Sequence, residues 1–187
     1  MSAEQVLAAS NSTEGAIVAA RTSNYEGFAI SLWGRFPVLV FLNHVVHGRS
    51  VPVGKITMER PLCGTYFCNF WFRYEIVCEE NPFVSTSEKW GVNEEIDKRY
   101  WGKFKAFKEY VNTFNLAEFD YTALAKSNYV FMRWQRDALI NHMADLENFP
   151  FSRFYYVCLT KTTGDIEAYY YDENSALHHT IDVKLIS

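Results

Sequence analysis

Residues 90–134 read WGVNEEIDKRYWGKFKAFKEYVNTFNLAEFDYTALAKSNYVFMRW. Apolar residues recur in steps of three and four along the first half, which predicts one amphipathic helix. Those residues are Ile96, Tyr100, Phe104, Phe107, Val111 and Phe114. Asn93 is expected to cap the helix, and the acidic residues after it favour the positive end of the helix dipole. The stretch therefore predicts a helix that packs on an apolar surface.

The second half of this stretch runs into a segment with two interpretations. Residues 129–148 fit a helix with Phe131, Leu139 and Leu146 on one side, and their first part, YVFMRW, fits a strand equally well. Periodicity leaves both open, and β-propensity favours a strand over residues 128–136.

Strand patterns flank the helical region on both sides. They cover residues 26–33, 37–46, 51–59, 65–78, 154–160, 165–171 and 181–185. The clearest is 65–78, where aromatic residues occupy both faces, so both faces are expected to be covered. The order is strands, then helices, then strands, which favours an antiparallel sheet, most economically closed into a barrel.

Composition excludes several classes of function. The 187 residues include 15 Phe, 12 Tyr and 5 Trp, a surplus that suits a β-rich core or an aromatic-lined cavity. A net charge of -4 argues against a nucleic-acid or membrane surface. The first residues, MSAEQVLAAS, lack the features of a signal peptide, so a cytoplasmic protein with reduced cysteines is expected.

The residues offer little for catalysis. His44 and His47 are three apart, which on a strand sends them to opposite faces. Cys63 has no accompanying base at a fixed spacing, and the common phosphate-binding, hydrolase and metalloprotease motifs are absent from the sequence. We expect a non-enzyme without cofactor or metal, and a small Cys–His hydrolase is the least favoured alternative.

Four motifs in fixed order carry a family resemblance. They are WGKF at 101–104, YVFMRW at 129–134, FYYVCL at 154–159 and IEAYYY at 166–171. Together they resemble the substrate-receptor family of the GID ubiquitin ligase, called CTLH in animals, where GID stands for glucose-induced degradation. The resemblance covers residues 25–186.

The resemblance implies a fold and its domain limits. The fold is a mostly β, eight-stranded antiparallel, lipocalin-like barrel with a helical insertion at about 93–126, and YVFMRW becomes a strand. The barrel domain would span 25–187, preceded by a flexible tail or extra strand at 1–24.

The resemblance also implies a function. Members bind N-terminal degron peptides that begin with proline or a small apolar residue, take them into the barrel mouth and present them to a RING ligase without doing chemistry. Tyr155 and Tyr170 match tyrosines of the family's peptide pocket, and Phe151 matches a phenylalanine of its wall. The expected location is the cytoplasm, with the nucleus as an alternative.

Several pocket positions depart from the family pattern. Arg136 stands where the family has the glutamate that clamps the peptide amine, and Ala29 stands where it has a pocket glutamine. The loop positions over the mouth become Met58, Pro61 and Cys68, which reshapes the wall. An arginine about 4 Å from an ammonium would weaken binding on the order of a hundredfold or more.

The family continues past the last strand into a tail that docks on an armadillo-like scaffold subunit, and the given sequence stops at Ser187. Two interpretations stay open. The protein is a divergent substrate receptor with an altered end-group preference, or a degenerate relative, a cytosolic barrel that binds another peptide or small ligand and does not serve the ligase.

Overall fold

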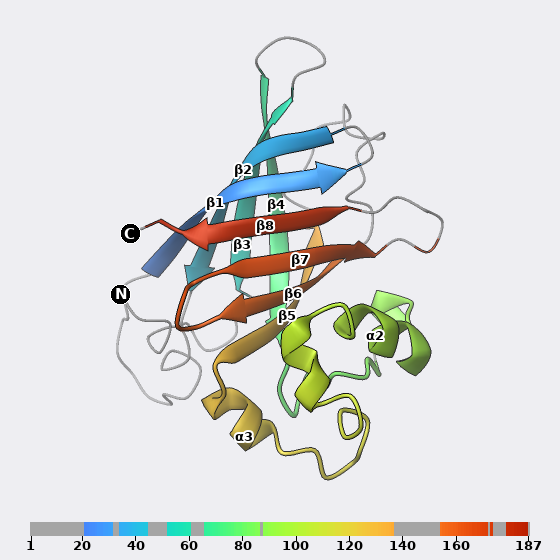
Figure 1. The fold of residues 1–187 in the computed structure, drawn as a ribbon. Coiled ribbons are helices and arrows are strands. Elements are labelled where there is room, and N and C mark those ends of the chain that lie inside the picture. Colours follow the sequence, from blue (N-terminus) through green and yellow to red (C-terminus); the bar gives the residue numbers. More distant parts are fainter. Residues whose placement is uncertain are drawn as a thin grey trace.

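The protein folds into a closed antiparallel barrel with a helical insertion packed on its outside (Figure 1). The structure is a computed structural model that describes residues 21–31, 34–44, 52–60, 66–86, 88–136, 154–171, 173 and 179–186. Eight strands form from the described residues, each pairing with the next, and β8 closes the barrel on β1. The predicted eight-stranded antiparallel barrel is confirmed.

The strands follow the expected order, with shifted ends. They are β1 (Arg21–Ser31), β2 (Gly34–His44), β3 (Val53–Arg60), β4 (Tyr66–Ile76), β5 (Tyr129–Arg136), β6 (Phe154–Thr160), β7 (Ile166–Tyr171) and β8 (Thr180–Leu185). Residues 129–136 form the strand β5, so the strand interpretation of this segment is confirmed. β1 begins at Arg21, inside the stretch expected to be a tail or an extra strand.

The barrel interior is one apolar core to which every strand contributes. Alternate residues point inward, so β4 supplies Phe70, Phe72 and Tyr74, and β6 supplies Tyr155 and Val157. The opposite face of β4 is not covered throughout, because Asn69 and Arg73 are exposed. The expectation that both faces of this strand are covered is therefore wrong for these positions.

The described residues of the connection between β4 and β5 form four short helices. They are η1 (Glu88–Trp90), α2 (Glu94–Trp101), η2 (Lys105–Glu109) and α3 (Tyr121–Lys126), where η denotes a 3-10 helix. Asn93 caps α2 as predicted, since its side chain accepts a hydrogen bond from Ile96 N at 3.0 Å. In Figure 1 the insertion lies against the outside of the barrel wall near β5 and β6.

The single amphipathic helix predicted across residues 96–114 is wrong. α2 ends at Trp101, because Gly102 is a poor helix residue and the chain turns there through hydrogen bonds to Tyr100 and Trp101 carbonyls. The turn lets Phe104 and Phe107 reach the same buried cluster as Trp101. The helical spacing marked residues that are buried or half-buried together, and packing on a twisted wall decided their backbone.

The insertion creates a second core on the outside of the barrel. Outward side chains of β5 and β6, including Phe131 and Tyr156, pack against Phe83, Trp101 and Phe107 of the β4–β5 connection. The wall formed by β5 and β6 is therefore buried on both faces, with one core inside the barrel and one outside.

A buried ion pair links the insertion to this wall. Arg133 of β5 contacts Asp97 of α2 at 2.9 Å, and the two side chains are 3% and 0% exposed. Asp97 also accepts hydrogen bonds from the Tyr156 hydroxyl at 2.9 Å and from the backbone of Ser85 at 2.7 Å. Arg133 donates as well to the Phe83 carbonyl at 2.6 Å, so the ion pair is part of a hydrogen-bonded network.

Within the described ranges, no helix has both the length and the apolar character needed to cross a membrane.

Candidate ligand-binding site at the mouth of the barrel

A small cavity lies inside the barrel, toward the end where β5 stops and β6 starts. Five strands line it with Ile56, Phe70, Trp71, Phe72, Trp134, Arg136, Tyr155 and Tyr170. Its volume is about 20 Å³, which is room for one water molecule or one ligand oxygen. An aromatic wall with a few polar groups is the usual composition of a binding pocket.

The structure brings three of the sequence-predicted residues to this cavity. Tyr155 and Tyr170 are paired across β6 and β7, with ring centroids 5.2 Å apart. Arg136 ends β5 two residues beyond Trp134, so both lie on the inward face of the strand. Arg136 therefore points into the mouth and not away from it.

The structure describes the side chains of two of the other predicted residues. Ala29 and Met58 are buried in the barrel interior, away from the cavity wall. The backbone of Cys68 pairs with that of Met58 in β3, and its side chain lies outside what the structure describes. Pro61 and Phe151, as well as the candidate nucleophile Cys63, also lie outside the described residues.

His179 is a further residue of this region, and the sequence motifs did not identify it. Its Nδ1 lies 3.2 Å from the Tyr155 hydroxyl, and its ring centroid is 6.3 Å from that of Tyr170. The sequence contains one signal for this placement. Residues 181 and 183 point inward on β8, and extending that period of two backward places residue 179 on the same face.

Burial makes the histidine and the tyrosine neutral partners. Desolvation lowers the pKa of His179 to about 4, so its ring is uncharged at neutral pH. Burial, with the neighbouring Tyr170 adding a smaller effect, raises the pKa of the Tyr155 hydroxyl well above its ordinary value. The hydrogen bond between Tyr155 Oη and His179 Nδ1 therefore joins two uncharged groups.

We expect His179 to make the fold acid-sensitive. Its pKa is depressed in the folded state, so between pH 6.5 and about 4 the unfolded chain binds a proton that the folded chain does not. The free energy of unfolding should fall with decreasing pH in this window by up to about 1.4 kcal/mol per pH unit from this group. Urea denaturation of the native chain and of His179→Gln at several pH values checks this. Parallel pH profiles for the two proteins would contradict it.

The cavity wall contains two buried hydrogen-bond donors without an acceptor among the described residues. They are the ring nitrogen Nε1 of Trp134 and Nε of Arg136. Trp134 stacks on Phe72 with centroids 4.6 Å apart, and it is 1% exposed. Of the described residues that line the cavity, none is an aspartate or a glutamate. The site is cationic and rich in donors.

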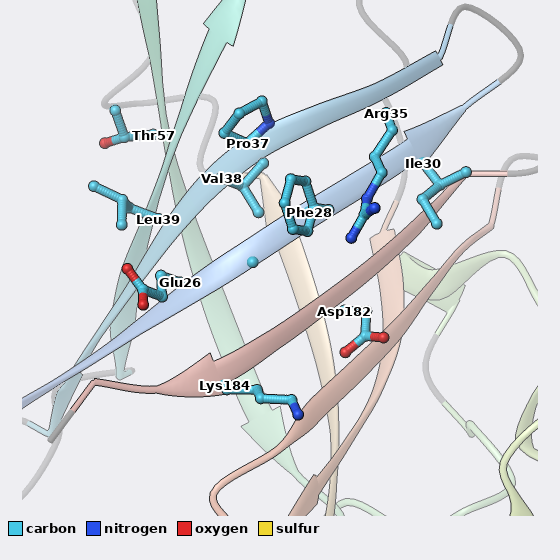
Figure 2. Close-up of a pocket in the computed structure, with 11 residues that line it drawn as sticks. Glu26, Phe28, Ile30, Arg35, Pro37, Val38, Leu39, Thr57, Asp182 and Lys184 are labelled. Carbon is cyan, nitrogen blue, oxygen red and sulfur yellow. The ribbon is translucent and has the colours of Figure 1, made fainter.

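A larger groove lies on the outer surface of β1, β2 and β8 (Figure 2). It has a volume of about 590 Å³ and an apolar floor that includes Phe28, Pro37 and Leu39. Its charges are mixed, because Glu26 and Asp182 lie near Arg35 and Lys184; the Arg35 guanidinium sits 3.5 Å from the Phe28 ring centroid. The groove includes none of the sequence-predicted site residues.

Across the described ranges, no three His, Cys, Asp or Glu side chains gather into a group that could hold a metal ion.

The described strands form a closed antiparallel barrel with an aromatic cavity, an architecture that ligand-binding β-barrels share. The particular family follows from comparison of the sequence with known proteins. The chain belongs to the family described as vacuolar import and degradation protein, which matches residues 18–186.

Individual relatives carry more specific names. The chain is 34% identical over 168 residues to the "Glucose-induced degradation protein 4 homolog" of Mus musculus, covering 86% of this chain and 74% of the relative. It is 29% identical over 158 residues to the "GID complex substrate-recognition subunit 4" of Schizosaccharomyces pombe, covering 80% and 77%. A shorter match, 34% over 93 residues, links it to subunit 10 of the same complex in that yeast, covering 48% of this chain and 17% of the relative.

Proposed function

We propose that this protein is the substrate-recognition subunit of a GID-type ubiquitin ligase. It binds N-terminal degron peptides with a proline or small apolar first residue in the barrel mouth and does no chemistry itself. The relatives named as substrate-recognition subunits support this proposal, as does the barrel with an aromatic cavity. The proposed partners are the degron peptides and the armadillo-like scaffold subunit, in the cytoplasm or the nucleus, with no nucleic acid or membrane involved.

The observation that carries this proposal is the pairing of Tyr155 with Tyr170 at an aromatic cavity. The rings of Phe72 and Trp134 offer an apolar surface for a first side chain, and the tyrosine hydroxyls offer partners for the polar end of a peptide. A cavity of about 20 Å³ holds no side chain, so a peptide enters only when a wall side chain moves. Arg136 is half-buried on the cavity wall, and we propose that movement of its side chain opens the mouth.

Tyr155→Phe tests the mouth assignment. It removes one hydroxyl and keeps the ring, whereas Tyr155→Ala would also remove a buried core side chain and destabilise the barrel by about 3–5 kcal/mol. We expect peptide affinity to fall by about tenfold, the usual worth of one hydrogen bond to a ligand. The measurement is fluorescence polarisation with short peptides that begin with free Pro, Ile or Gly, and with acetylated versions of each.

Tyr25→Phe is the matched control, because Tyr25 is equally buried in the barrel interior but does not line the cavity. Equal affinities for native protein, Tyr155→Phe and Tyr25→Phe would remove Tyr155 from the binding site.

The alternative is a barrel that binds a different ligand and does not serve the ligase. Arg136 on the cavity wall favours it, because a cation there opposes the free amine of a peptide. Stable association with an armadillo-like scaffold subunit, measured by co-purification of the two proteins, would support the receptor. Failure of the two to associate, combined with failure to bind any free-amine peptide, would favour the alternative.

A further inference from the structure

We infer that the mouth cavity receives a carboxylate oxygen of its peptide ligand, held by Arg136. This inference rests on the proposed function and adds the chemical class that the cavity selects. Its basis is the charge of the wall, two donors on wall residues that lack acceptors among the described residues, and the size of the cavity.

The charge of the wall is positive. Arg136 is half-buried on the inward face of β5, opposite Phe72 of β4. Every other described residue that lines the cavity is uncharged at neutral pH, including Tyr155 and Tyr170. His179 lies behind Tyr155 and is neutral too, because burial lowers its pKa to about 4. The cavity therefore presents a guanidinium without a counter-charge on its described walls.

The second observation is the hydrogen-bonding state of the wall. Nε of Arg136 and Nε1 of Trp134 are both buried, and both lack an acceptor among the described residues. Buried donors in folded proteins are almost always paired, because leaving one unpaired is unfavourable. Both donors require an oxygen with free lone pairs, and an ammonium group offers none.

The size of the cavity restricts the group that fits. A volume of about 20 Å³ accepts one oxygen atom of a carboxylate without moving the aromatic wall. A charged oxygen forms stronger hydrogen bonds with a guanidinium than a neutral carbonyl oxygen does. Among peptide groups, the carboxylate matches the charge, the donors and the space together.

A peptide has two sources for such a group. One is an aspartate or glutamate side chain in the first two residues, and the other is the carboxylate at the C-terminus. Both present the same oxygen to Arg136, so a binding experiment must separate them by using peptides that carry only one source each.

The test is fluorescence polarisation with three peptide types on the full chain. The first begins Pro-Gly with an amidated C-terminus, the second begins Pro-Asp with an amidated C-terminus, and the third is N-acetylated with a free C-terminal carboxylate. The proteins are the native chain, Arg136→Gln and the control Arg73→Gln. Arg73 is exposed on the outer face of β4, next to Phe72, and its removal changes net charge equally.

We expect the native chain to bind at least one of the two carboxylate-bearing peptides about tenfold to a hundredfold more tightly than the Pro-Gly peptide. This is the range for a charge-assisted hydrogen bond. Arg136→Gln should lose this preference, and Arg73→Gln should keep it. The preference should also weaken with added salt in the native chain. Thermal denaturation of each variant confirms that it is folded.

The outcomes separate the two proposals. Equal affinity of the native chain for neutral and acidic peptides, unchanged in Arg136→Gln, overturns the carboxylate inference and leaves the peptide receptor standing. Failure of all three peptides to bind the folded native chain overturns both. Retention of the preference in Arg136→Gln shows that another group selects the carboxylate, which also overturns the role given to Arg136.

Discussion

Asp97→Ala is expected to lower the free energy of unfolding by about 3–5 kcal/mol, because it leaves the buried guanidinium of Arg133 without its counter-charge. The same substitution removes the acceptor for the Tyr156 hydroxyl and for the backbone of Ser85. For a chain of this size, the loss corresponds to a decrease in Tm of roughly 6–20 °C. Thermal and guanidinium denaturation followed by circular dichroism measure it.

The network explains why this loss should exceed that of an ordinary ion pair. Exposed ion pairs contribute at most about 1 kcal/mol, whereas breaking a buried pair exposes neither partner to water. Arg133 remains enclosed because its guanidinium lies among the rings of Trp101 and Tyr156, at 5.1 and 5.8 Å from their centroids. Its Nε already lacks a partner among the described residues, so the site has no spare acceptor.

Asp120→Ala is the matched control. Asp120 is exposed and caps α3 through a hydrogen bond from Ala123 N at 2.8 Å, so its loss should cost about 1 kcal/mol. Asp97→Asn should cost nearly as much as Asp97→Ala, since the amide removes the charge and cannot accept at both former oxygens. A cost for Asp97→Ala no greater than that for Asp120→Ala would contradict the structural role of the network.

Gly27→Ala is expected to destabilise the barrel by about 3 kcal/mol, at the upper end of the range for a methyl forced into a packed site. A Cβ at residue 27 would lie 2.1 Å from the carbonyl oxygen of Asp182 and 2.7 Å from the Cα of Val183. Both contacts are with the backbone of β8, so no side chain can rotate away. The strands β1 and β8, whose pairing closes the barrel, would have to separate locally.

Glu26→Ala is the control for this prediction, because it changes the adjacent, exposed residue of the same strand and should shift stability by less than about 0.5 kcal/mol. Urea denaturation followed by tryptophan fluorescence compares the two variants with the native chain. A native-like midpoint for Gly27→Ala would mean that β1 and β8 are not held this closely.

Part of the fold follows from local patterns that the structure reproduces. The alternation in β8 (Thr180–Leu185) and the cap at Asn93 depend on near neighbours in the chain, so the sequence predicts them well. β5 was harder, because the residues 130–134 are all buried and show no alternation. Both faces of this strand are covered, which erases the period-two signal.

In the helical insertion, the sequence pattern identifies the residues that pack together but not the path of the backbone. Six apolar residues at helical spacing gave a correct list of residues that pack together and a wrong backbone between 102 and 114. Spacing reports which side chains face an apolar surface, and it contains no information on where the chain must bend to follow that surface.

The candidate site also combines features that the sequence indicates with contacts that only the fold creates. The family resemblance suggested a mouth at positions 136, 155 and 170, and the inward direction of Arg136 follows from its spacing to Trp134. The contact of His179 with Tyr155 joins residues 24 apart in sequence on different strands, which only the closed barrel brings together.

The sequence by itself determined the strand order, the antiparallel class and the aromatic character of the interior, because these depend on composition and on short-range periodicity. Only the tertiary structure decided that Asp97 pairs with Arg133, that Trp134 and Arg136 line one cavity, and that the insertion bends at Gly102. These features depend on contacts between distant segments. Their energies come from burial, which no single stretch of sequence specifies.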